Sequence, residues 1–380
     1  MSKLKFKYKM LMAMFYGVMI TSLWPNNIYL LVSFSLLTYI VLPIKRWWNS
    51  TALILLVFSL FYSMMAVMNN QYGSGFVLIT LLIAPVGLYR FGQWLMYNFY
   101  EDEIRQKLFM LIIATYLLPL FILTFQDVQL VGVVNVSREM MGDLDSSDSL
   151  AATLYGMMSS VGIACIASLF AKRQSLGIRL IYIILSLLSL FVVIHLVNRT
   201  GLIVFITCLI AALVVSTNMK LSKIIPLLIL MGMVIFVVLK TGIIADDIFN
   251  AYMDREMSVS GDTSQLGGRS DIWADAFNKL VTHPFGWERV RYAHNLWLDI
   301  ARVGGWLALL LFVIPTFKWI RGLFRLAHKA TTPFVLIILS INAAMLLSSF
   351  VEPVIEGSVL FFSLLMMMWG VTDYLSKEIQ

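Results

Sequence analysis

The sequence predicts an all-α membrane protein that crosses the bilayer about twelve times. Of its 380 residues 60% are hydrophobic and 13% are charged, and the mean hydropathy of +0.86 lies far outside the range of soluble domains. Apolar runs of roughly 17 to 24 residues recur along the chain, each long enough to cross about 30 Å of hydrocarbon as a helix. The runs lack the alternation of barrel strands, so the spans are expected to be helices.

The first span follows Lys3, Lys5, Lys7 and Lys9, and no small-residue cleavage pattern comes after it. We therefore expect a retained helix with a cytoplasmic N-terminus. Residues 1–380 are predicted to form one integral membrane domain with both termini in the cytoplasm. The predicted spans lie near 10–24, 27–44, 51–68, 75–97, 107–125, 150–171, 178–197, 201–217, 222–239, 294–317, 332–351 and 357–374.

The distribution of charge agrees with this topology. Lys and Arg gather in the loops that it places in the cytoplasm, whereas most acidic residues fall in the loops on the other side. Because cytoplasmic loops of membrane proteins are enriched in Lys and Arg, the formal net charge of +7 indicates orientation in the membrane. We expect membrane lipid around the protein and no nucleic-acid partner.

Metal and redox chemistry find little support in the sequence. Cys165 and Cys208 lie inside apolar spans and are expected to be small buried hydrophobic residues. The acidic stretch at 142–148 departs from a calcium loop, because Asp148 replaces the glycine at the sixth position and Leu154 the glutamate at the twelfth. The histidines show no zinc-ligand spacing. No metal and no cofactor are predicted.

Two predicted extracytoplasmic loops stand out, at 126–149 and at 240–293, the second being the long one. Such a long polar excursion is typical of a functional loop. It contains an expected amphipathic helix near 270–282 that ends before Pro284 and has Arg269 at its N-terminal edge. This helix could lie on the membrane surface or pack on the bundle, and Arg269 could be a solvated surface residue or part of a site. Its expected apolar face comprises Ile272, Trp273, Ala276, Phe277 and Leu280.

Arg199 lies in a very short predicted turn between the seventh and eighth spans. Its guanidinium is therefore expected at or just inside the membrane face. A charge deep in hydrocarbon costs at least about 2.5–3.5 kcal/mol on insertion scales, so this side chain should reach the interface or face a wet cavity or an anion. Both interpretations of Arg199 stay open.

The tenth predicted span begins at His294 and Asn295, directly after two further arginines, Arg289 and Arg291. Three basic side chains within six residues favour an anion-binding role for this end of the loop. A helix here would place Asp299 three residues before Arg302, on one side, as an ion pair.

Aromatic residues near the long loop have two interpretations. Most aromatic side chains at the ends of spans are expected in the interfacial belt. Those near the loop could instead stack on sugar rings, namely Tyr252, Trp273, Trp287 and Tyr292.

Three segments resemble the O-antigen polymerase and O-antigen ligase superfamily of bacterial inner-membrane enzymes. They are "NRTG" at 198–201, "GGRSDIWADAF" at 267–277 and "AHNLWLDIARVGGW" at 293–306. They resemble the family's Arg-Ser/Thr element between two spans, its Gly-Arg-x-x-x-Trp loop helix and its His-Asn motif with a downstream glycine.

The resemblance implies a fold like that of C-type glycosyltransferases and a metal-independent transfer of glycan from undecaprenyl diphosphate. It implies that arginines bind the lipid diphosphate and that a histidine activates the acceptor hydroxyl. By this correspondence His294 is the expected base, and Arg199 and Arg269 contact the diphosphate. The remaining expected substrate-binding residues are Arg289, Arg291, Tyr292, Asn295 and Asp299. A guanidinium suits this chemistry because it offers a rigid fork of donors to phosphate and stays protonated.

Three functions remain open at this point. We expect an O-antigen polymerase in the bacterial inner membrane that joins lipid-linked oligosaccharide units, a donor and an acceptor, on the periplasmic face. The preference for a polymerase rests on the 25 residues from Arg269 to His294. This segment is compact compared with the one expected in a ligase, which docks a bulky lipid A core. The alternatives are an O-antigen ligase, which transfers the polymer to the lipid A core, and a lipid-linked oligosaccharide flippase. A membrane protein that regulates chain length is a further expected partner.

Overall fold

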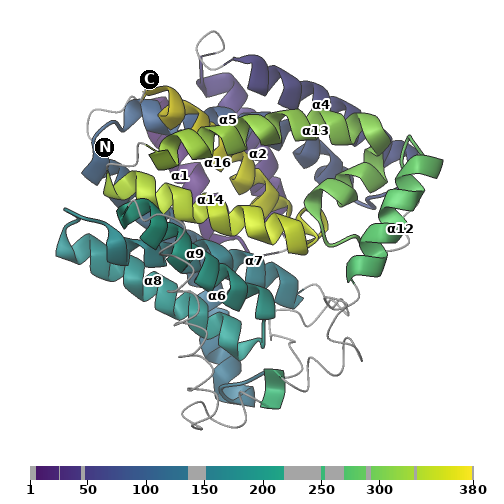
Figure 1. Cartoon of the computed structure of the whole chain (residues 1–380). Helices are drawn as coiled ribbons and strands as arrows, with labels where there is room; N and C mark the ends of the chain where they lie inside the picture. Colours follow the sequence, from purple (N-terminus) through teal and green to yellow (C-terminus); the bar gives the residue numbers. More distant parts are fainter. Residues whose placement is uncertain are drawn as a thin grey trace. The chain divides into compact units, whose positions relative to one another are not determined.

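The computed structural model describes residues 6–24, 26–43, 48–135, 151–217, 250–252, 269–287, 292–328 and 332–378. Every regular element in these residues is a helix, as predicted (Figure 1). The protein is thus a multi-pass helical membrane protein. Among the described residues, nine helices are long and apolar enough to cross a membrane, and α2 (Asn27–Val41) is a shorter apolar helix. The first predicted span corresponds to α1 (Phe6–Ile20), which is not among the nine, and the predicted ninth span, 222–239, lies outside the described residues, so the count of twelve stays a prediction.

The elements with described bounds are α-helices, apart from the 3-10 helix η2. In order they are α1 (Phe6–Ile20), α2, α4 (Ser50–Met68), α5 (Gly75–Asn98), α6 (Asp102–Val131), α7 (Ala151–Ile163), η2 (Ala164–Phe170), α8 (Leu176–His195), α9 (Arg199–Thr217), α12 (Arg269–Thr282), α13 (Leu296–His328), α14 (Pro333–Val351), α15 (Val354–Gly357) and α16 (Val359–Glu378).

The chain forms two compact units. The first comprises Met1–Pro119, Ile272–Lys329 and Met345–Gln380, and the second comprises Leu120–Asp271 and Ala330–Ala344. The prediction that residues 1–380 form one membrane domain stays a prediction.

In the first unit, α5 packs against α2, α4 and α16, and α13 packs against α4 and α16. A Cβ atom added at Gly92 of α5 would meet the carbonyl oxygen of Met367, and one at Gly370 of α16 would meet that of Tyr89. The backbones of α5 and α16 therefore lie in direct contact, which small residues permit between membrane helices.

In the second unit, α7, η2, α8 and α9 pack together. The predicted span at 150–171 consists of α7 and η2, because the helix tightens to a 3-10 geometry at Ala164. Helix α6 runs to Val131, six residues past the predicted end of its span at 125. The polar Asp127 ends the apolar run but not the helix, since its buried carboxylate accepts hydrogen bonds from Asn135 Nδ2 at 2.6 Å and contacts His195 Nε2 at 2.8 Å.

A kink divides α13 at Gly305, whose backbone has φ 64° and ψ −158°. A break in a helix leaves carbonyl oxygens without their partners four residues on. Here the Arg302 oxygen accepts the Trp287 N–H at 2.9 Å and the Val303 oxygen accepts Asn69 Nδ2 at 2.8 Å. Two segments that precede the kink in sequence thus donate hydrogen bonds to the carbonyl oxygens that the interrupted helix leaves free.

We expect Gly305→Ala to destabilise the protein strongly. Its positive φ disfavours any side chain, and a Cβ atom would meet the Pro284 backbone. Gly17→Ala in α1 is the matched control, because a Cβ atom there meets nothing within 4 Å. Thermal unfolding of the purified proteins in detergent measures the difference. Equal melting temperatures for the two variants would contradict the role given to Gly305.

Candidate functional site

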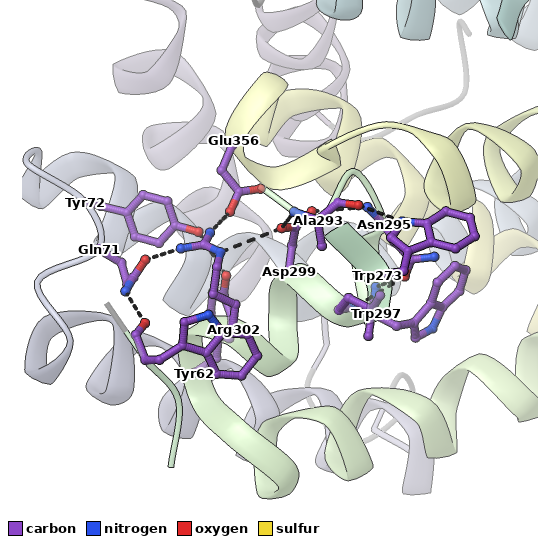
Figure 2. Close-up of polar contacts among 12 residues, drawn as sticks. Tyr62, Gln71, Tyr72, Trp273, Ala293, Asn295, Trp297, Asp299, Arg302 and Glu356 are labelled. Atoms are coloured by element: carbon purple, nitrogen blue, oxygen red, sulfur yellow. Dashed lines mark hydrogen bonds and ion pairs between the residues drawn. The ribbon is translucent and has the colours of Figure 1, made fainter. Parts of the chain in front are cut away.

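The start of α13 forms a tightly bonded turn around His294. The Asn295 side chain caps the helix, because its Oδ1 accepts from the N–H groups of Trp297 at 3.1 Å and Leu298 at 3.2 Å. The two oxygens of Asp299 accept from the N–H groups of Ala293 at 2.8 Å and Asn295 at 3.3 Å. One carboxylate therefore holds the peptide groups on both sides of His294 (Figure 2).

His294 adopts a left-handed backbone conformation with φ 51°. Such a conformation in a residue other than glycine costs on the order of 1–3 kcal/mol and persists only where its surroundings hold it. Besides the Asp299 carboxylate, the Trp273 indole N–H donates to the Ala293 carbonyl at 2.7 Å and fixes the same turn from α12. The half-buried imidazole is therefore carried on a backbone that is constrained on both sides.

A buried charge network lies beside this turn. Arg302 is 2% exposed, and its Nε lies 3.7 Å from Asp299 Oδ1, which confirms the ion pair predicted from their spacing. Its two terminal nitrogens contact Gln71 Oε1 and Glu356 Oε1 (Figure 2), and its guanidinium carbon lies 5.7 Å from the centroid of the Tyr292 ring. Glu356 and Gln71 were not among the site residues predicted from the sequence.

Two tyrosines border the network. The Tyr62 and Tyr72 hydroxyls lie 2.9 Å apart. Burial raises the pKa of Tyr72 well above its ordinary value, and the nearby Tyr62 and Glu356 raise it further. The Tyr72 phenol therefore remains protonated and adds no negative charge to the network.

The predicted turn at Arg199 is present. Arg199 is the first residue of α9, and Asn198 caps this helix by accepting the Gly201 N–H at 2.9 Å. The Asn198 amide also donates to the Ala152 carbonyl at 3.2 Å, which ties the turn to α7. Arg199 is partly buried at a helix N-terminus, where the helix dipole favours an anion.

A buried histidine that the sequence analysis did not select lies just before this turn. His195 is fully buried. Its Nε2 is 2.8 Å from Asp127 Oδ2, and its Nδ1 is 2.9 Å from the Val133 carbonyl oxygen. The Asn135 N–H donates to the His195 carbonyl at 2.7 Å. These bonds join the end of α8 to the end of α6 and to residues 133–135.

Helix α12 begins at Arg269 and ends at Thr282, which confirms the predicted amphipathic helix. Ala276 and Leu280 are buried against residues of the loop and of α13. Phe277, which was expected on this face, is 57% exposed. The buried cluster comprises Ala276, Leu280, Trp287, Ala293, Leu298 and Ala301, with Ile272 and Trp273 packed against it.

All four aromatic residues considered for sugar stacking make contacts within the protein, and that of Tyr292 is with the Arg302 guanidinium. Trp273 donates to Ala293, Trp287 is 9% exposed in the same cluster, and the Tyr252 hydroxyl donates to the Val193 carbonyl at 3.2 Å.

The structure brings four predicted site residues together in the first unit, namely Tyr292, His294, Asn295 and Asp299. Arg199 and Arg269 belong to the second unit. Arg289 and Arg291 lie outside the described residues. The proximity of these four arginines to His294 stays a prediction. In the described part of the chain, no group of three or more His, Cys, Asp or Glu side chains is arranged to hold a metal ion.

We expect variants of the charge network to differ in stability in a defined order. Arg302→Met leaves two buried carboxylates without their cation, and loss of one partner from a buried pair costs about 3–5 kcal/mol. Glu356→Leu is expected to cost less, because Arg302 keeps Asp299. The double variant should recover part of the loss of Arg302→Met. Thermal unfolding measures the order, with the exposed Arg321→Met as the control. A double variant no more stable than Arg302→Met would contradict the coupling.

Comparison with known proteins identifies the segment around Arg199 and Arg269. Residues 184–287 match the family model described as O-antigen ligase. The match includes both arginines and ends before His294. No curated protein matches the chain. Over residues 184–287 the chain is similar to this family, and the stretch includes two of the three motifs that carried the resemblance, at 198–201 and 267–277.

Proposed function

We propose that this protein is an O-antigen polymerase that transfers a glycan from undecaprenyl diphosphate to the hydroxyl of an acceptor repeat unit. His294 is the general base, and Arg199 and Arg269 bind the donor diphosphate. Arg289 and Arg291 bind phosphate or sugar beside them. The observation that carries the proposal is the constrained turn that holds His294, next to a segment that matches the O-antigen ligase family.

The departing diphosphate sets the electrostatic requirement. Negative charge gathers on its oxygens as the glycosidic bond breaks, and fixed cations aimed at that charge lower the barrier. At an effective dielectric constant of 20, two unit charges about 4 Å apart interact with roughly 4 kcal/mol. Two or three arginines could therefore supply the stabilisation that a divalent ion would otherwise give.

The acceptor hydroxyl needs a group that takes its proton. A histidine of ordinary pKa suits this step at neutral pH if nearby cations keep it neutral. Arg302 is already paired with Glu356 and Asp299, so in this proposal Arg289 and Arg291 supply the cationic surroundings. The hydroxyl oxygen then attacks the anomeric carbon opposite the diphosphate, the proton moves to His294, and the configuration of that carbon inverts.

Asn295 and Asp299 orient the site in this mechanism. The Asn295 amide caps α13, and both Asp299 oxygens accept backbone N–H groups. Because these contacts already engage the Asn295 amide and the Asp299 carboxylate, both groups are assigned a positioning role and no direct part in the reaction. Tyr292, whose ring lies over the Arg302 guanidinium, is proposed to line the sugar-binding part of the site.

The second candidate function is O-antigen ligase, because the matching family model carries that description. The two reactions differ in the acceptor, which is a lipid-linked repeat for a polymerase and the lipid A core for a ligase. A deletion strain distinguishes them. A single repeat on the core supports the polymerase, whereas bare core with accumulated lipid-linked polymer supports the ligase.

Transport of the lipid-linked sugar would contradict both enzymatic functions. Purified protein in lipid vesicles tests this directly with a lipid-linked oligosaccharide as substrate. We expect the glycan to be lengthened or transferred. Movement of the lipid-linked sugar across the bilayer without any change in the glycan would identify a flippase.

We expect His294→Ala to abolish glycan transfer while the protein inserts and accumulates normally, because the acceptor hydroxyl loses its base. The polymer pattern of a complemented deletion strain on a gel measures transfer, and immunoblotting measures abundance. His328→Ala is the control, since that histidine is exposed near the end of α13 and its ring contacts the Phe324 carbonyl one turn earlier in the same helix. Wild-type polymer in the His294 variant would remove the proposed base.

We expect Arg199→Lys and Arg269→Lys each to lose most activity, although charge is conserved. A lysine ammonium is a point charge and does not reproduce the planar fork that binds phosphate through two hydrogen bonds. The same polymer assay serves, with Arg321→Lys as the control on an exposed position. Full activity of the lysine variants would show that a surface role fits these arginines better.

A further inference from the structure

Helix α12 carries an apolar stripe that the rest of the described protein does not cover. Ala274, Phe277 and Val281 recur at intervals of three and four residues, so they share one side of the helix. Phe277 is 57% exposed and Val281 is 73% exposed. Phe285, just past the end of the helix, is 71% exposed. We call these four residues the α12 stripe.

The α12 stripe lies between two other faces of the same helix. On one side is the buried face with Ala276 and Leu280. On the other side are the polar residues Asp271, Asp275, Asn278 and Lys279, of which Asp275 and Lys279 form an ion pair at 2.8 Å. A helix between protein and water needs only two faces, one apolar and one polar. The third, apolar and exposed, therefore needs a different neighbour.

The segment of α13 after the kink indicates that this neighbour is lipid. This segment belongs to a helix long enough to cross a membrane, and its exposed apolar residues recur at helical spacing on one side, so that side faces lipid. They are Trp306 at 44%, Leu307 at 49%, Leu310 at 53%, Ile314 at 46% and Phe317 at 68% exposure.

Backbone contacts join the α12 stripe to this lipid-facing side. The Trp306 N–H donates to the Pro284 carbonyl at 3.0 Å. A Cβ atom at Gly305 would lie 2.7 Å from the Phe285 Cα, so the two backbones touch. Phe285 thus lies directly beside Trp306, where the lipid-facing side of α13 begins. Figure 1 shows α12 beside one end of α13 at the edge of the view.

We propose that α12 lies in the membrane–water interface of the extracytoplasmic leaflet, with the α12 stripe in contact with lipid acyl chains. Its polar face then turns to the headgroups and water, and its buried face holds the His294 turn through Trp273. An interfacial helix of this kind is stabilised by the apolar area that it buries in lipid. The continuity with α13 favours lipid over a protein partner as the occupant.

This placement adds to the proposed function the depth at which Arg269 meets the donor diphosphate. That addition rests on the proposed function. Arg269 is the first residue of α12. A helix that lies in the interface holds its first residue at the depth of lipid phosphates, where the diphosphate of a membrane-bound donor is found. The protein would then meet the donor at the bilayer surface and not in the aqueous phase.

Spin labels on the full-length protein in liposomes test the placement. Single cysteines are introduced at Phe277, Val281 and Phe285 and labelled in a background in which Cys165 and Cys208 are replaced by Ala. Collision rates of each label are measured with oxygen, which concentrates in lipid, and with a water-soluble nickel chelate. Leu310→Cys provides the lipid-facing reference, and Asp275→Cys, on the polar face of the same helix, provides the water-facing reference.

We expect the ratio of oxygen to nickel collisions at the three stripe positions to approach that of Leu310 and to exceed that of Asp275. A ratio equal to that of Asp275 would overturn the proposal, because the stripe would then face water. Low collision rates with both reagents would overturn it as well, because protein would then cover the stripe.

The assay needs no substrate, so its outcome is independent of glycan transfer. Polymer formation by the same variants in the deletion strain separates the two proposals. Lipid contact in a protein that transfers no glycan would leave the placement of α12 intact and refute the enzymatic function. Water contact in an active protein would refute the placement of α12 and leave the enzymatic function intact. Elution of each variant as a single species confirms that it is folded.

Discussion

The burial of the Arg302 guanidinium is the constraint on which the candidate site depends. An arginine stays protonated in proteins, and a lone charge removed from water costs several kcal/mol. At 2% exposure it must therefore have both countercharge and hydrogen-bond acceptors nearby. Glu356 and Asp299 supply the charge, and Gln71 supplies a neutral acceptor. The need to neutralise one side chain thus brings together α13, α15 and the segment after α4, which are far apart in sequence.

This network reaches His294 through Asp299. The same carboxylate that lies beside Arg302 accepts the N–H groups of Ala293 and Asn295. Arg302 therefore limits where Asp299 can lie, and Asp299 in turn limits the backbone of His294, whose positive φ would relax without such support. The Gly305 kink contributes from the other side, because it releases the Arg302 carbonyl to bind Trp287 and so anchors the loop that leads back to α12.

Sequence patterns predicted the features that depend on neighbours along the chain. The apolar runs predicted the described spans, and the three-residue spacing predicted the pair of Asp299 and Arg302. Glu356 and Gln71 were not predicted, because they lie 54 and 231 residues from Arg302 and no local pattern links them to it. Phe277 was predicted on one apolar face with Ala276 and Leu280, but it is exposed whereas they are buried, since an apolar pattern does not show which of its residues the protein covers. The kink was not anticipated, because the "GG" at 304–305 also occurs in continuous helices.

The two buried or half-buried histidines differ in what their surroundings allow. Both ring nitrogens of His195 face acceptors, the Asp127 carboxylate and the Val133 carbonyl, so this ring would have to break a buried bond before it could take a proton from a substrate. Its contacts instead fix the chain directly before Arg199, where Asn198 caps α9. His294 is held through its backbone, on which the Asp299 carboxylate and the Trp273 indole act at the neighbouring residues, and its side chain is half buried. A base must be fixed in position and still reachable by the acceptor, and the proposed base, His294, combines a constrained backbone with a half-buried side chain.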